Sequence, residues 1–325
     1  MKILVTGATG FLGFRLIEKL HNLKYVNEIV ATGRQIRKTH FIKSHKVNYI
    51  LGDISDSNFV NKIISKTDVV INCAALSAPW GTYSEFKKAN IKTQTNIINA
   101  SKNNGVKKII FISSPGVYYE FKDKLNISEE DPLPKKFVNN YAKTKFQAEE
   151  LLRSSEIPHV IFRPRAIIGR GDHVIMPRLI KAYDEKKLKI VGNGENIVDF
   201  TPVSNVVDAI ILSINNEDAL NQTFNLSNGT PVKLWEKINY VLKKLDKKII
   251  TKKVPYGIAY FVTYISELKS KVLKSKEPAT TTYSIGILSK SFTLNIQKAE
   301  KILNYKPKQS IDDAIEEFVV WYKKK

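Results

Sequence analysis

Tyr141 and Lys145 stand four residues apart in the run YAKTK, inside a segment whose apolar spacing predicts a helix over 139–155. That spacing places the two side chains on one face of a helix. A lysine beside a tyrosine stabilises the tyrosinate and lowers the phenol pKa from about 10, so the pair can exchange a proton near neutral pH. Because lysine is abundant throughout the chain, chance alone also produces this spacing, and the neighbouring elements must decide.

Two serines supply the next partner for this chemistry. Ser113 and Ser114 end the apolar run KKIIFISS (107–114), which predicts a strand. Ligands of a doubly wound sheet bind at the carboxyl ends of its strands. A serine hydroxyl there would bind a substrate oxygen, Tyr141 would transfer the proton as a hydride moves to or from a nicotinamide ring, and Lys145 would also hold the nicotinamide ribose. No step needs a metal, and one cysteine with five scattered histidines gives no metal-binding spacing.

A glycine-rich turn, TGATGFLG (6–13), follows the first predicted strand and opens the first helix. Glycines at this place permit a tight turn and let the backbone approach a pyrophosphate, and the helix N-terminus offers free N–H groups. The strand–turn–helix context is the one that a dinucleotide site requires. The expected cofactor contacts are Gly7, Thr9, Gly10, Phe11, Leu12 and Gly13.

The segment after the second predicted strand favours NADP(H) over NAD(H). An NAD site usually carries an acidic residue there, which binds the ribose 2′-hydroxyl. This chain has no acidic residue between Ile29 and Gly52 but has Arg34, Arg37 and Lys38. A guanidinium binds a 2′-phosphate, which a carboxylate would repel. Further along the cofactor we expect Asp53 at the adenine amino group, Ile54 beside the adenine ring, and Ala74 and Ala75 under the dinucleotide.

Strands alternate with helices over the first half of the chain, which predicts an α/β fold with a doubly wound parallel sheet of the Rossmann type. Continuous apolar strands such as VVIN and IIFI indicate burial on both faces. We expect a cofactor-binding domain over 1–165 and a smaller substrate-binding lobe over 166–325, with 198–228 returning to the sheet. The predicted strands are 2–6, 28–32, 47–53, 68–75, 107–114 and 159–164; the helices are 14–22, 58–66, 84–104 and 139–155, then 175–187, 234–247 and 311–323.

The composition favours a globular protein with anionic partners. The chain has 325 residues and a net charge of +21, although its lysines are spread evenly and also fit a solvated basic surface. No nucleic-acid-binding motif is present, so we expect no nucleic-acid partner. The single cysteine and the strand that begins directly after Met1 favour the cytoplasm.

The longest apolar run, VPYGIAYFVTYI (254–265), is too short to span a bilayer, and a lysine-rich segment follows it. Residues 254–275 therefore fit either an amphipathic segment at a membrane surface or a core helix with a basic outer face.

These motifs together resemble the extended short-chain dehydrogenases/reductases, and the resemblance covers nearly the whole chain. TGATGFLG, the Gly-Asp pair at 52–53, NCAA (72–75), S-S-x-x-V-Y (113–118), YAKTK and FRP (162–164) occur in family order, as do RGD (170–172) and VDFTPVSNVVDA (198–209). The resemblance selects Ser114 over Ser113 as the catalytic serine and adds Asn90 as a further catalytic residue. It also implies cofactor contacts at Arg163 and Pro164, and a homodimer through helices 84–104 and 139–155.

Several stretches are more similar to the 3-beta-hydroxysteroid dehydrogenase branch and its bacterial 2-alkyl-3-oxoalkanoate reductases, among them AALSAPWGTYSEFKKAN (74–90) and FNLSNGTP (224–231). This likeness implies reduction of a ketone, or the reverse oxidation, on a hydrophobic β-keto acid or sterol-like substrate. Two alternatives stay open: a nucleotide-sugar epimerase or dehydratase with tightly bound NAD, and a cofactor-sensing protein without catalysis. The candidates for the substrate cleft are Trp80, Tyr83, Arg163, Arg165 and His173, with Arg165 or Arg170 holding a carboxylate.

Overall fold

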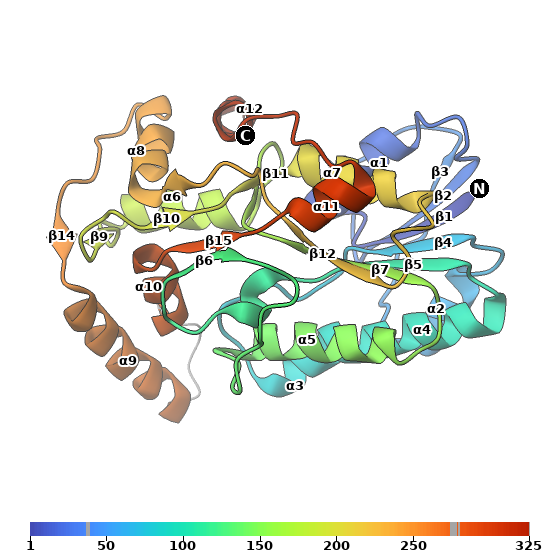
Figure 1. Cartoon of the computed structure of the whole chain (residues 1–325), viewed down its shortest axis with the longest axis horizontal. Helices are drawn as coiled ribbons and strands as arrows, with labels where there is room; N and C mark the ends of the chain where they lie inside the picture. The colour runs from blue at the N-terminus through green and yellow to red at the C-terminus, as the bar shows by residue number, and fades with distance from the viewer. Residues whose placement is uncertain (37–39, 274–277, 279, 325) are drawn as a thin grey trace.

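A computed structural model of the chain describes all residues except 37–39, 274–277, 279 and 325. Its centre is a seven-stranded sheet in which every neighbouring pair is parallel, so the fold-class prediction is confirmed (Figure 1). The order is β12-β7-β5-β4-β1-β2-β3. The bounds are β1 Lys2–Thr6, β2 Glu28–Thr32, β3 Val47–Tyr49, β4 Val69–Asn72, β5 Lys108–Ile112, β7 His159–Pro164 and β12 Gln222–Leu226.

Helices cover both faces of this sheet because successive residues of a strand point to opposite sides. Ile110 packs in a core beneath α1 (Phe11–Leu20), α7 (Val203–Ile214) and α11 (Gln297–Leu303). Its neighbours Ile109 and Phe111 pack in the core beneath α2 (Ser57–Ile63), α4 (Thr93–Asn104) and α5 (Asn140–Arg153). Every residue of β4, β5 and β7 is buried, as their unbroken apolar runs predict.

A smaller lobe packs beside the carboxyl ends of the central strands (Figure 1). It holds a four-stranded sheet with the order β13-β10-β15-β6 and a core of its own. The strands are β13 Val232–Lys233, β10 Ile197–Val198, β15 Phe292–Leu294 and β6 Lys124–Ile127. The helices are α6 Ile175–Asp184, α8 Leu234–Lys244, α9 Tyr256–Val272, α10 Thr282–Ser289 and α12 Ile311–Lys323. Two further strand pairs join β8 (Ile167–Ile168) to β11 (Thr201–Pro202) and β9 (Ile190–Val191) to β14 (Lys253–Val254).

The chain passes between the two lobes more than once. Segment 198–228 contains β12, which pairs with β7 at the edge of the central sheet. In the opposite direction, β6 precedes residue 165 but pairs with β15 in the small sheet. The two lobes are therefore not two consecutive halves of the sequence.

The predicted helix over 84–104 is interrupted. It consists of α3 (Tyr83–Phe86), a π-helical stretch over Lys87–Lys92, and α4. A π-helical turn widens the helix locally and is frequent at functional sites. Helix α1 begins at Phe11, three residues earlier than predicted, because the helix starts directly at the glycine turn.

Candidate active site

The glycine turn at 7–13 forms a close-packed cradle at the carboxyl end of β1. Gly7 has φ +65°, and a Cβ on it would lie 2.8 Å from the Ala74 nitrogen. A Cβ on Gly13 would lie 2.2 Å from the Gly7 oxygen. Gly10 caps α1 without a side-chain hydrogen bond, so the first amides of the helix are open to an anion. The cradle fits the pyrophosphate of a dinucleotide.

The residues predicted to hold the rest of the cofactor lie around this cradle. Asp53 accepts a hydrogen bond from the Ser55 amide at 2.8 Å, which lowers the pKa of its carboxyl, and Arg34 and Lys88 lower it further by their charges. Arg34 is exposed, and Arg37 and Lys38 lie outside the described residues. Phe11, Ile54 and Ala74 are partly exposed, Ala75 is exposed, and Thr9 and Leu12 are buried.

Asn72 fixes the end of β4 beneath the cradle. Its side-chain oxygen accepts hydrogen bonds from the Thr6 hydroxyl at 2.6 Å and from the Ala74 amide at 3.1 Å. Its nitrogen donates to Gln94 of α4 at 2.7 Å. Asn72 thus ties β1, the loop after β4 and α4 together. The sequence analysis included Asn72 only as part of the NCAA run (72–75) and assigned it no role.

The structure brings Ser114 and Tyr141 together. Tyr141 lies in the first turn of α5, which Asn139 caps by accepting a 2.8 Å hydrogen bond from the Ala142 amide. Burial raises the pKa of Tyr141, while the nearby side chains of Ser77 and Ser114 act to lower it. Ser77 joins this site without having been predicted, and the signal for it was its place in the loop directly after β4.

Lys145 lies one turn further along α5 and is 1% exposed. Its ammonium donates a 2.6 Å hydrogen bond to the Ile112 carbonyl, at the end of β5, and lies 4.0 Å from the centre of the Phe111 ring. Burial lowers the pKa of Lys145 to about 7, while the charge of Glu149 pulls it upwards. The side chain therefore loses its proton more readily than a solvated lysine, and it lies beside the strand end that carries the two serines.

Glu149, the next residue on the same face of α5, separates the roles of the two serines. Its fully buried carboxylate accepts a short hydrogen bond from the Ser113 hydroxyl, whereas the Ser114 hydroxyl accepts one from the Gly116 amide and contacts Tyr141. Ser113 therefore belongs to the support of the site and Ser114 to the site itself. Sequence reasoning missed Glu149, although its spacing four residues after Lys145 could have revealed it.

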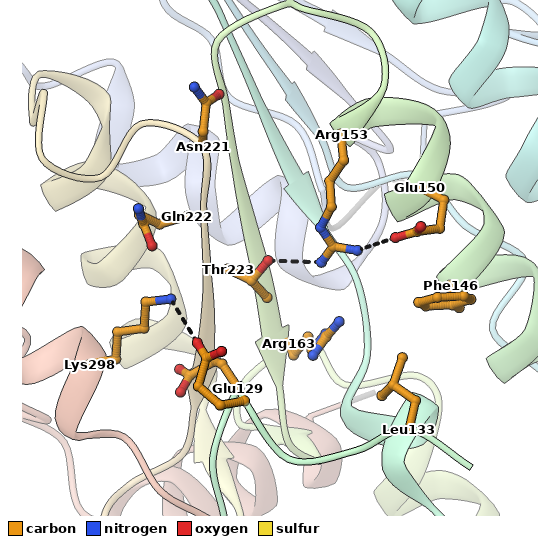
Figure 2. Close-up of a pocket in the computed structure, with 11 residues that line it drawn as sticks. Glu129, Leu133, Phe146, Glu150, Arg153, Arg163, Asn221, Gln222, Thr223 and Lys298 are labelled. Atoms are coloured by element: carbon orange, nitrogen blue, oxygen red, sulfur yellow. Dashed lines mark hydrogen bonds and ion pairs between the residues drawn. The ribbon is translucent and has the colours of Figure 1, made fainter. Parts of the chain in front are cut away.

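Arg163 is held by the same carboxylate. Its Nε donates to Glu149 at 3.0 Å, its Nη2 donates at 2.5 Å, and its Nη1 bonds the Tyr118 hydroxyl. Glu149 and Tyr118 thus already bind the Arg163 guanidinium, and the cofactor contacts of Arg163 and Pro164 stay predictions. Figure 2 shows Arg163 with Arg153 and Thr223 in a cavity of about 360 Å³ between α5 and the strands β7 and β12.

Asn90 lies in the π-helical stretch and is 3% exposed. Its oxygen accepts a 2.9 Å hydrogen bond from the Leu76 amide, and its nitrogen donates to the Thr144 hydroxyl at 3.1 Å. The amide therefore joins the loop that carries Ser77 to the helix that carries Lys145. These contacts make it a positioning residue for both.

The match to known families agrees with this geometry. The model of the NAD dependent epimerase/dehydratase family matches residues 3–227, which contain the cradle, the serines, Tyr141 and Lys145. The chain belongs to this family. A nicotinamide dinucleotide is thus the cofactor type that the cradle fits.

Curated relatives of this family member cover nearly its whole length. The chain is 29% identical to the sterol-4-alpha-carboxylate 3-dehydrogenase (decarboxylating) of Candida albicans, over 98% of this chain and 97% of that one. It is 28% identical to the 2-alkyl-3-oxoalkanoate reductase of Stenotrophomonas maltophilia, over 97% of each. These relatives are oxidoreductases. Among solved structures, the UDP-glucuronic acid 4-epimerase of Bacillus cereus in complex with NAD shares the fold with a TM-score of 0.77 and 24% identity, over 100% of this chain and 99% of that one.

The substrate side of this epimerase/dehydratase-family site is aromatic. Tyr283 of α10 lies close enough to Tyr141 to affect its pKa, and its ring meets Tyr119 edge-on at 5.6 Å. Arg165 is 8% exposed, its guanidinium lies 4.6 Å from the centre of the Phe292 ring, and its Nε has no hydrogen-bond partner among the described residues. Sequence reasoning missed Tyr283 because it lies 142 residues after Tyr141 and 118 residues after Arg165.

The remaining cleft candidates are bonded elsewhere or only partly buried. Arg170 pairs with Glu18 at 2.7 Å and with Glu317 at 3.1 Å, so its guanidinium is already occupied by carboxylates. The Tyr83 hydroxyl donates to Gln147 at 3.1 Å. His173 stacks between the rings of His40 and Trp321, and Trp80 is partly buried.

Proposed function

We propose that the protein is an NADP(H)-dependent oxidoreductase that interconverts a ketone and a secondary alcohol on a hydrophobic substrate. The observation that supports the proposal is that the Ser114 hydroxyl lies close enough to Tyr141 to affect its pKa, with the buried Lys145 one turn further along α5. When bound, the nicotinamide supplies or accepts the hydride. The chain's own residues need only orient the substrate oxygen and move one proton.

Each of the three residues has one task in this scheme. The Ser114 hydroxyl donates a hydrogen bond to the substrate oxygen and Tyr141 protonates that oxygen in reduction or deprotonates it in oxidation. In this proposal the Lys145 ammonium stabilises the tyrosinate by its positive charge, which would oppose the effect of burial, because burial raises the pKa of Tyr141. Proton transfer by a positioned group of this kind contributes about 10²–10⁴-fold in rate.

We propose a β-keto acid or its 3-hydroxy counterpart as the substrate class. The names of the two relatives share one chemical feature, an oxygen function at carbon 3 with a carboxylate two bonds away. Arg165 could bind such a carboxylate, because it lies among the aromatic residues on the substrate side and keeps a donor free. Arg170 does not suit this role, since Glu18 and Glu317 already bind it.

The decisive test is the oxidation of NADPH by the purified protein with long-chain β-keto acids, 3-oxosteroids and UDP-sugars, with NADH in parallel. Tyr141→Phe should abolish turnover and leave cofactor binding intact, with Tyr25→Phe, a partly exposed tyrosine outside the site, as the matched control. Survival of activity in Tyr141→Phe would refute the mechanism. In Arg165→Ala we expect a loss of β-keto acid turnover at unchanged cofactor affinity.

A nucleotide-sugar epimerase or dehydratase is the second candidate, because the matching family model and the UDP-glucuronic acid 4-epimerase likeness favour it. NAD that stays bound through purification, with turnover of a UDP-sugar and no net NADPH oxidation, would support it. A cofactor-sensing protein would bind NADPH and turn over nothing. The homodimer through helices 84–104 and 139–155 stays a prediction, which light scattering can test.

A further inference from the structure

Helix α9 presents an apolar face to water at one end of the molecule (Figure 1). Six of its side chains are each at least 38% exposed: Ile258, Phe261, Val262, Tyr264, Ile265 and Leu268. Leu273, directly after the helix, is 73% exposed. These positions recur at helical spacing and therefore form one continuous stripe. A contiguous apolar surface of this kind on a globular protein commonly marks a binding surface.

The inner face of α9 packs against the small lobe. Tyr256, Ala259 and Tyr260 pack on the core of the small lobe. Thr263 and Glu267 follow on the same side and are buried. The helix is thus apolar on its outer face although its packing uses only the inner one, which is opposite to the usual pattern of a surface helix.

Within residues 252–270, every exposed charged side chain is a lysine. Glu267 is the single acidic residue of α9, and its carboxylate is turned inward, where it accepts a 2.7 Å hydrogen bond from the Thr282 amide. Lys269 is exposed next to the stripe, and Lys252 and Lys253 are exposed just before the helix. The whole chain carries a net charge of +21.

We propose that the outer face of α9 binds the surface of an anionic lipid bilayer. An apolar stripe bordered by lysines can insert into the headgroup region while the lysines meet anionic lipids. A second copy of the chain fits less well, because a two-fold interface would place the stripe's lysines against one another. No helix among the described residues is long and apolar enough to span a membrane, so the contact would be peripheral.

The inner face connects this surface to the substrate side of the active site. Tyr260 meets Phe121 edge-on at 6.0 Å, Phe121 meets Tyr119 at 5.5 Å, and Tyr119 meets Tyr283, the neighbour of Tyr141. A bilayer under α9 would therefore lie on the side of the aromatic residues that lead to Tyr141, and a membrane-dissolved substrate could approach from there. Docking itself does not depend on the proposed reaction.

Flotation of the full chain with vesicles tests the proposal. The protein should float with vesicles that contain phosphatidylserine, float much less with phosphatidylcholine alone, and be released by high salt, which screens exposed charges. Phe261→Ser should lower partitioning about tenfold or more, the equivalent of removing one buried aromatic side chain from the lipid contact.

A matched pair of valines provides the control. Val262 on the stripe and Val320 on α12 are exposed to 62% and 56%. Val262→Ser should weaken flotation and Val320→Ser should not. Wild-type protein that stays in solution with anionic vesicles, or equal losses in both variants, would overturn the proposal. A concentration-dependent dimer that Phe261→Ser abolishes would show that a second copy covers the stripe and would also overturn it. None of these measurements uses turnover, so failure here and failure of the proposed reaction are separate results.

Discussion

Replacing Glu149 with glutamine should change both the stability of the protein and the pH dependence of its activity. The carboxylate is fully buried and binds Ser113, Arg163 and Arg153. Glutamine keeps its shape and one acceptor oxygen but removes the charge that balances Arg163, which is itself 3% exposed. Breaking a buried pair in this way costs about 3–5 kcal/mol. We expect about 3 kcal/mol, because Arg153 is partly solvated and glutamine retains one hydrogen bond.

The effect on activity runs through Lys145. Burial lowers the pKa of Lys145 to about 7, and Glu149 acts to raise it, so removal of the negative charge lowers that pKa further. The ammonium is the form that stabilises the tyrosinate, and it is lost as the pH rises through its pKa. The alkaline limb of kcat/KM in Glu149→Gln should therefore move to lower pH by about one unit or more. At the pH values where Glu149→Gln has lost activity, the wild type should still be active.

Two measurements separate the outcomes. Urea unfolding gives the stability, and the NADPH-dependent rate from pH 5 to 10 gives the profile. Glu150→Gln is the matched control, since Glu150 is the next residue on α5 and its ion pair with Arg153 is solvent-exposed. A loss of stability with an unchanged profile would refute the electrostatic link to Lys145 and leave Glu149 a purely structural residue. If neither the stability nor the pH profile changed, the buried ion pair between Glu149 and Arg163 would be refuted.

Four further predictions concern the cofactor site and the proposed catalytic residue Lys145. Lys145→Met should raise the free energy of unfolding at pH 7 by about 1–3 kcal/mol, because it removes a buried charge whose pKa is lowered. Turnover should fall to background in the same variant; urea unfolding checks the stability and a rate assay checks the turnover. Wild-type protein should gain stability as the pH rises from about 7 towards 10, since Lys145 still binds a proton in the unfolded chain after losing it in the folded one. A melting temperature that does not change across that pH range would contradict this. Gly13→Ala should abolish NADPH binding in fluorescence titration, because the added Cβ would lie 2.2 Å from the Gly7 oxygen. Arg34→Ala should weaken NADPH about tenfold and leave NADH unchanged, and an equal effect on both would rule out a 2′-phosphate contact.

The sequence predicts the parts of the fold in which one local signal dominates. The unbroken apolar runs of β4, β5 and β7 predict buried parallel strands, and the glycine turn predicts a helix after β1, although α1 begins three residues before the predicted start. Helix α7 is missed because VVDAIILSI is apolar nearly all round, which hides the helical period. Helix α10 is missed because Gly286 lies inside it; a Cβ there would lie 2.4 Å from the Tyr119 hydroxyl, so packing demands the glycine.

The residues of the candidate site also divide into those with a local sequence signal and those without one. Local spacing and strand ends nominate Tyr141, Lys145 and a serine at 113 or 114, and the family resemblance then selects Ser114. Glu149 and Tyr283 act through partners distant in sequence, such as Arg163 and Tyr119, and only the folded chain shows those contacts. Arg170 and Arg163 were predicted to contact substrate or cofactor, but carboxylates elsewhere in the chain already bind their guanidinium groups. A sequence motif cannot reveal such a partner.

The exchange of strands between the lobes has a consequence for how the chain is made. A growing chain that ends near residue 165 holds β7 as an unpaired edge in which every residue is destined for burial, and its partner β12 is still 58 residues away. The same fragment carries β6 without β15, which follows only at 292–294. Exposed apolar edges of this kind invite pairing with other chains. The proposed catalytic residues are thus all synthesised by residue 145, yet the central sheet beneath them is complete only at residue 226 and the small sheet only at residue 294.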